Sequence, residues 1–141
     1  MSNKNVFFGL NDVGKTNVLY AFRYVFDNEL RKKGIIESDF FQRNINDPIE
    51  ITVSLDISDD NEDNQKIRAI IKGNLLSETR EIYIKFMSVF NVQNSSGDIM
   101  MYWGYDIDNL GEMASRGYSF ELDRIFNVTY IDSYVDLFLL F

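Results

Sequence analysis

The sequence predicts a mixed α/β fold in which a helix follows a glycine-rich loop and an antiparallel sheet follows the helix. Residues 9–16 fit the pattern G-x-x-x-x-G-K-[ST] and come directly after the apolar run 6–8. Residues 18–30 repeat apolar side chains at three- and four-residue spacing, which is typical of a helix with one buried face. Residues 49–57 alternate apolar with polar side chains, which is typical of a strand with one buried face.

The glycine-rich loop has the composition of a site for nucleotide phosphates. Gly9 and Gly14 allow the backbone to curl around an anion because no Cβ stands in the way. Backbone N–H groups at the start of the following helix point toward that anion, and the helix dipole favours negative charge there. We expect Lys15 to reach the β- and γ-phosphates and the Thr16 hydroxyl to ligate Mg²⁺, so ATP and Mg²⁺ are the predicted ligands. The residues predicted to bind the nucleotide are Gly9, Asn11, Asp12, Val13, Gly14, Lys15, Thr16 and Asn17.

The helix that follows the loop is expected to end near Gly34. Three basic residues, Arg31, Lys32 and Lys33, come just before this glycine. Cations interact favourably with the dipole at the C-terminal end of a helix, and glycine is common just past that end. The aromatic side chains within the helix are expected to pack in the core.

Further elements follow from the same patterns of spacing and from turn residues. A turn is expected around residues 46–48, ahead of the strand 49–57. The remaining expected elements, in chain order, are a helix over 65–76, a strand over 82–90, a turn over 94–98, a strand over 99–105, a short helix over 120–126 and a strand over 128–131 with a helical tail beyond it.

Acidic residues gather between Asp56 and Asp63, ahead of the second expected helix. An EF-hand loop starting at Asp59 would need glycine where Asn64 stands and glutamate where Ile70 stands. The EF-hand is therefore excluded, and a solvated turn with acidic residues at the helix N-terminus is expected instead.

Two positions allow both a functional and a structural interpretation. Trp103 and its tyrosine neighbours could stack on a base, although packing within the sheet is the commoner role of such residues. The apolar residues 128–131 end at Asp132, which resembles a Walker B strand whose carboxylate helps to hold Mg²⁺. Ser133 follows Asp132, however, where a Walker B strand has a glutamate.

Composition excludes several classes of function. The chain has 141 residues, enough for one domain with a real core, and it contains no cysteine and no histidine. Disulfides, thiol catalysis, histidine bases and the usual zinc sites are therefore excluded. The formal charge of −8 disfavours DNA binding by this chain alone, because Lys and Arg supply most of that affinity. We find no signal peptide and no apolar run long enough for a membrane span, so no membrane partner is expected and the cytoplasm is the expected location.

The stretch Phe7 to Leu19 resembles the P-loop of SMC- and RecF-like ABC ATPases. It is most similar to OLD-family ATP-dependent endonucleases and related AAA ATPases. Asn11 and Asn17 are the discriminating residues, because a generic P-loop requires neither. The spacing of residues 38–41 ahead of 49–53, and the residues Tyr130-Ile131-Asp132, also resemble that family.

The resemblance implies a P-loop NTPase N-terminal lobe with an antiparallel β subdomain, and residues 1–141 as one partial ATPase domain. It also implies that residues 128–131 form the strand before the Q-loop, so that Asp132 lies near the nucleotide only by analogy. Three further regions lie C-terminal in the family, beyond the position that corresponds to Phe141. They are the Walker B strand with its glutamate, the signature sequence and a Toprim nuclease region. We therefore expect a chain that binds ATP and Mg²⁺ but does not hydrolyse ATP alone.

The resemblance further implies partners: a C-terminal ATPase half or a second subunit, and DNA only through the complete assembly. Two alternatives stay open. One is a non-enzymatic interaction module, derived from a degenerate ATPase, that forms a homodimer through the apolar residues 135–141. The other is a small P-loop kinase, for which Arg116 and Arg124 are the candidates for a lid over the phosphates.

Overall fold

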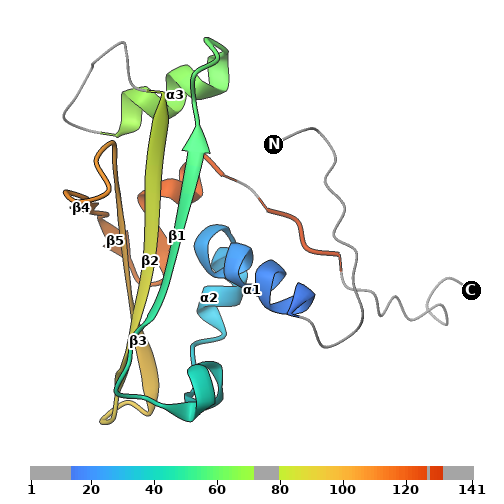
Figure 1. Ribbon diagram of the computed structural model, residues 1–141, viewed down its shortest axis with the longest axis vertical. Coiled ribbons are helices and arrows are strands. Elements are labelled where there is room, and N and C mark those ends of the chain that lie inside the picture. Colours follow the sequence, from blue (N-terminus) through green and yellow to red (C-terminus); the bar gives the residue numbers. More distant parts are fainter. Residues whose placement is uncertain (1–13, 72–79, 127, 132–141) are drawn as a thin grey trace, which may run out of the picture.

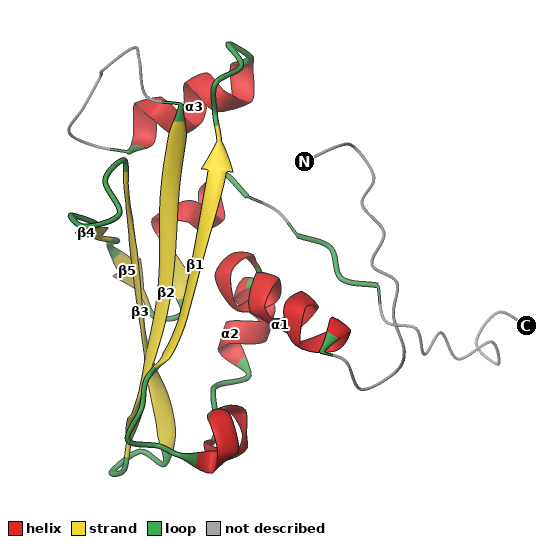
Figure 2. Ribbon diagram, in the orientation of Figure 1, coloured by secondary structure: helices red, strands yellow, loops and turns green. Residues whose placement is uncertain are grey.

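A computed structural model describes residues 14–71, 80–126 and 128–131. These residues form a mixed α/β structure with an antiparallel sheet, as predicted (Figures 1 and 2). The elements in chain order are α1 (Lys15–Phe26), α2 (Asn28–Lys32), the 3-10 helices η1 (Glu37–Asp39) and η2 (Phe41–Arg43), β1 (Ile49–Asp56), α3 (Glu62–Ile70), β2 (Glu81–Asn91), β3 (Ser96–Gly104), β4 (Gly111–Glu112), β5 (Ser115–Arg116), β6 (Ser119–Phe120) and the 3-10 helix η3 (Glu121–Arg124).

The main sheet has four antiparallel strands in the order β1-β2-β3-β4, and one of its faces carries the core. The register pairs Val53 with Ile84 and Ile84 with Trp103, so these side chains share the inner face. Figure 1 shows α1 and α2 on one side of this sheet. The ring of Tyr24 from α1 stacks on Phe86 of β2 with centroids 5.5 Å apart, which fixes the helix against the inner face.

The structure confirms three of the predicted strands and the role of Trp103. The predicted strand 49–57 corresponds to β1, the strand 82–90 to β2, and the strand 99–105 to β3, which begins three residues earlier. Trp103 is buried among the core side chains, so it packs within the sheet. The strands β4, β5 and β6 were not predicted, since two residues are too few to show a period.

The predicted helix over 18–30 is in fact two helices with a break at Asp27. This residue has extended φ and ψ angles of −112° and 101°. Its carboxylate accepts the backbone N–H groups of Glu29 and Leu30, at 2.9 and 3.3 Å, and so caps α2. Arg23 donates to the same carboxylate at 2.9 Å. Gly34 has a φ of +82°, which agrees with the predicted helix end.

The other predicted helices are shorter than expected. The helix α3 begins at Glu62, where the Asn61 side chain accepts the N–H of Asn64 at 2.8 Å, and its last residue is Ile70. Glu62 and Asp63 occupy its first turn, which confirms the role expected for the acidic cluster. The predicted helix 120–126 is the 3-10 turn η3. Residues 72–76 of the second expected helix lie outside the described residues.

The strand predicted over residues 128–131 is wrong. These residues have no regular secondary structure and pair with neither sheet of the described chain. A strand needs a neighbour for its backbone hydrogen bonds, and here the segment is held by a side chain instead. The Arg23 guanidinium lies 3.8 Å from the centre of the Tyr130 ring, while Ile131 is 80% exposed. Asp132 and the expected tail lie outside the described residues.

Arg31 is fully buried, although the sequence suggested an ordinary basic residue at a helix end. Its guanidinium donates to the carbonyl oxygens of Val25, Tyr24 and Tyr118, at 2.9, 3.2 and 3.4 Å. It also forms a salt bridge with Asp123 of η3. The buried charge therefore joins α1 and α2 to the hairpin β5–β6 and to η3.

Replacing Arg31 should destabilise the fold much more than replacing its neighbour Lys32. Arg31→Ala leaves Asp123 and three carbonyl groups without their donor, so we expect a loss of about 3–5 kcal/mol in the free energy of unfolding. Lys32→Ala removes only an exposed ion pair with Glu29 and should cost less than about 1 kcal/mol. Urea denaturation measures both values. Equal costs for the two variants would contradict the central role of Arg31.

The cap at Asp27 predicts a pH dependence of stability. Partial burial raises the pKa of Asp27, but the hydrogen bonds from Arg23, Leu30 and Glu29 outweigh it and hold the pKa below its usual value. A carboxyl with a lowered pKa stabilises the fold above its unfolded pKa, and this contribution is lost as pH falls through the folded pKa. Asp27→Asn keeps a capping side chain but removes the charge.

We therefore expect wild type to be more stable than Asp27→Asn near neutral pH, with a difference that shrinks below about pH 4. Thermal denaturation over a series of pH values measures it. A difference that is the same at neutral and at acidic pH would show that the Asp27 charge does not stabilise the fold.

Candidate nucleotide site and the adjoining cavity

The described part of the predicted phosphate site is the start of α1. Gly14 has φ and ψ angles of 84° and 6°, in the left-handed region that favours glycine, and it directly precedes the helix. The twelve-residue α1 then begins at Lys15, which places Thr16 and Asn17 in its first turn. This turn contains no acidic residue, so nothing within it opposes an anion at the N-terminal end of the dipole.

The structure brings together four of the predicted site residues, Gly14 to Asn17, on one turn of backbone. Gly9, Asn11, Asp12 and Val13 lie outside the described residues, as does Asp132. The candidate lid arginines of a kinase, Arg116 and Arg124, lie in β5 and η3. Arg31 joins η3, through Asp123, to the carbonyl groups of Tyr24 and Val25. These carbonyl groups lie near the C-terminal end of α1, which is the end opposite Lys15.

The packing of α1 differs between its two halves. Val25 and Phe26 are buried in the core near the C-terminal end. Val18 and Leu19, near the N-terminal end, are 42% and 45% exposed. The helix is therefore anchored at one end and presents the other, with the predicted phosphate site, at the surface.

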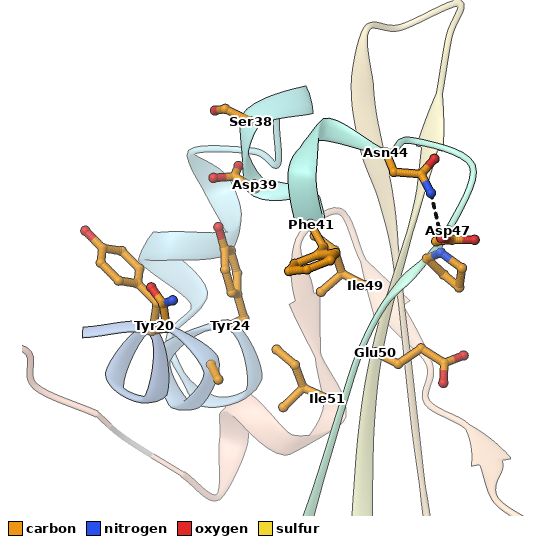
Figure 3. A pocket seen from close by; sticks show the side chains of 13 residues that line it. Tyr20, Tyr24, Ser38, Asp39, Phe41, Asn44, Asp47, Ile49, Glu50 and Ile51 are labelled. Carbon is orange, nitrogen blue, oxygen red and sulfur yellow. Dashed lines mark hydrogen bonds between the residues drawn. The ribbon is translucent and has the colours of Figure 1, made fainter. Parts of the chain in front are cut away.

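A cavity of about 710 Å³ lies beside the N-terminal half of α1. One wall is the face of α1, and the opposite wall is the segment that runs from η1 through η2 to the start of β1 (Figure 3). Its lining includes aromatic, amide and carboxylate side chains, among them Asn17, Tyr20, Tyr24, Asp39, Phe41 and Asp47.

Hydrogen bonds define the polar wall of the cavity. The Asp39 carboxylate accepts the Ile36 N–H at 2.8 Å, and Asn44 donates its side-chain amide to Asp47 at 2.6 Å. Burial, with the nearby charge of Asp39, raises the pKa of Tyr24 to about 12. The Tyr24 phenol is therefore neutral at physiological pH and retains its proton.

Sequence reasoning identified the motif residues but missed this cavity. The sequence feature that could have indicated the cavity is the pair Phe40-Phe41, because the residues around it have neither a helical nor a strand period. Phe40 packs in the core, with its ring 5.5 Å from that of Phe90, whereas Phe41 is 81% exposed. A sequence cannot say which of two adjacent phenylalanines is the core residue, because a short loop has no fixed period.

No metal cluster and no membrane span occur in the part of the chain that the structure describes. Within it, no three of the His, Cys, Asp and Glu side chains come together in a way that could hold a metal ion. Among the same residues no helix has both the length and the apolar character that crossing a bilayer requires.

Comparison with known proteins places the chain next to an endonuclease. It is 40% identical over 144 residues to endonuclease GajA of Bacillus cereus strain VD045. The match covers all of this chain but 25% of that protein, so the chain spans about a quarter of the length of the curated relative it matches. No family model matches the chain. The similarity agrees with the endonuclease part of the resemblance found in the sequence.

Gly14 and Gly34, two of the glycines with a left-handed backbone, provide a matched test of the helix start. Both have a φ near +80° and neither has an atom within 4 Å of the position of an added Cβ. Changing either to alanine should therefore cost about 1–2 kcal/mol of stability through backbone strain alone. Urea denaturation measures the two costs. A Gly14→Ala protein as stable as wild type would show that the left-handed turn before α1 is not formed.

Proposed function

We propose that this chain is the ATP- and Mg²⁺-binding lobe of a cytoplasmic DNA-transaction ATPase of the OLD, RecF and SMC type. The phosphates bind to the backbone and side chains of residues 9–17, and Thr16 ligates Mg²⁺. The observation that carries the proposal is the start of α1 at Lys15, directly after a left-handed glycine. This is where the motif requires a helix to begin if its Gly-Lys-Thr residues are to hold phosphates.

The anchoring of α1 supports this proposal, because a phosphate site must be rigid to be preorganised. The aromatic stack of Tyr24 on Phe86 and the buried residues Val25 and Phe26 fix the helix on the sheet. Its N-terminal turn is therefore held in place while remaining accessible to a ligand.

We propose that the activity on DNA belongs to the complete assembly and not to this chain alone. The relative that matches the chain is an endonuclease, and we propose that DNA is acted on through the complete assembly, with a C-terminal ATPase half or a second subunit. The net charge of −8 favours such a division, because an acidic lobe attracts phosphate backbones poorly. On this proposal the chain alone does not hydrolyse ATP.

A second candidate function is an interaction module that binds no nucleotide. The observation that favours it is the exposed apolar pair Val18 and Leu19 on α1, which has the character of a protein-contact surface. In that case Lys15 and Thr16 would have no phosphate to bind, so a nucleotide titration separates the two candidates.

The test is a titration of the purified chain with a fluorescent ATP analogue and Mg²⁺. We expect saturable binding, weakened roughly tenfold to hundredfold in Lys15→Ala, because a hydrogen bond to a charged group contributes ~1.5–3 kcal/mol. Lys33→Ala is the matched control, since Lys33 is exposed at the far end of the helical segment. Circular dichroism of each variant checks that the fold is intact.

The alternative outcomes are equally clear. No binding by folded wild type would contradict the proposal and favour the interaction module. ATP turnover by the chain that vanished in Lys15→Ala would contradict the expectation that this lobe does not hydrolyse ATP alone.

A further inference from the structure

We infer that the cavity beside α1 holds the base and ribose of the nucleotide, while the phosphates lie at the start of α1. This inference rests on the proposed function and adds to it the orientation of the ligand. The triphosphate would face the first turn of α1, and the nucleoside would lie along the side of the helix.

The cavity is continuous with the predicted phosphate site through Asn17. This residue belongs to the first turn of α1 and also lines the cavity. Tyr20 and Tyr24 follow on the same face of the helix, at three- and four-residue spacing. The three side chains span about 10 Å of helix, so a single ligand can contact the first turn and the tyrosines together.

Aromatic rings face the cavity from two sides. Figure 3 shows Tyr20 and Tyr24 extending from α1 and Phe41 on the opposite wall. Tyr20 is 40% exposed and Phe41 is 81% exposed, so both rings retain faces that protein atoms do not cover. Every base has a π-face, and stacking on aromatic side chains is the usual way in which proteins hold a base.

The backbone directly after Phe41 is strained. Gln42 and Arg43 have φ angles of 52° and 58°, in the left-handed region that residues with a Cβ rarely adopt. These two residues follow directly on Phe41, which lines the cavity, whereas Phe40 before it is held in the core by its contact with Phe90. Strain of this kind occurs preferentially at ligand sites, where the surrounding structure maintains it for a function.

The polar groups of the cavity favour a nucleoside over phosphates. The carboxylates of Asp39 and Asp47 can accept hydrogen bonds from the amino group of a base or from ribose hydroxyls. The same carboxylates repel phosphates, which directs the triphosphate toward the first turn of α1. The neutral phenol of Tyr24 supplies a donor from the opposite wall, on α1.

The test compares the binding of two ligands, ATP and inorganic tripolyphosphate, each with Mg²⁺, by isothermal titration calorimetry. In Phe41→Ala we expect ATP to bind about tenfold more weakly, because a stacked base is lost, with tripolyphosphate binding unchanged. Tyr20→Ala should behave in the same way. Ile107→Ala is the matched control, since Ile107 is a large exposed apolar residue that does not line this cavity.

The outcomes separate a failure of the base-binding cavity from a failure of the phosphate site. Unchanged ATP affinity in both Phe41→Ala and Tyr20→Ala, with binding of both ligands lost in Lys15→Ala, would overturn this inference and leave the phosphate site standing. Equal weakening of ATP and tripolyphosphate in Phe41→Ala would also overturn it, because the change would then act on the phosphates. If wild type binds neither ligand, the proposed function fails and this inference fails with it. Melting temperatures of all variants confirm that they are folded.

Discussion

The buried guanidinium of Arg31 is the interaction on which the arrangement of the described chain depends. A guanidinium has five N–H donors in a rigid plane, and here they reach α1, the β5–β6 hairpin and η3. Arg31 and Asp123 are 92 positions apart in the sequence. Because a buried cation without partners is very costly, the fold is stable only when these distant segments meet around it. Asp123 also accepts the N–H of Phe120, so the same carboxylate organises the start of η3.

The contacts of Arg31 fix the C-terminal end of α1, and this determines where the N-terminal end of the helix lies. The C-terminal half of the helix is held by Arg31, by the stack of Tyr24 on Phe86 and by the break at Asp27. The twelve residues of α1 then extend about 18 Å to Lys15, since a helix rises 1.5 Å per residue. The position of the candidate phosphate site is therefore a consequence of packing at the opposite end of the helix.

The segment between α2 and β1 shows how the core can shape a surface cavity. Phe40 is fixed by its edge-to-face contact with Phe90, and the next residue then points away from the core. The left-handed backbone of Gln42 and Arg43 reverses the chain immediately afterwards, and the Asn44–Asp47 hydrogen bond closes the turn before β1. A burial preference at one residue thus determines the exposure of its neighbour, and with it the wall of the cavity.

The sequence by itself determined the elements that have a long and regular period. The alternation in β1 and β2, the helical spacing in α1 and the acidic first turn of α3 are local properties, so each could be predicted from its own residues. The motif that ends in Gly14, Lys15 and Thr16 could likewise be read directly, because a left-handed glycine before a helix is a local requirement.

Only the tertiary structure decided how these elements end and meet. The burial of Arg31 and the irregular path of residues 128–131 depend on side chains distant in the sequence, since Arg31 contacts Asp123 and Arg23 contacts Tyr130. The cavity beside α1 is formed by residues from α1, η1, η2 and β1, whose approach no local pattern encodes. Periodicity reports which face of an element is buried, whereas the partner of that face is selected by packing across the whole fold.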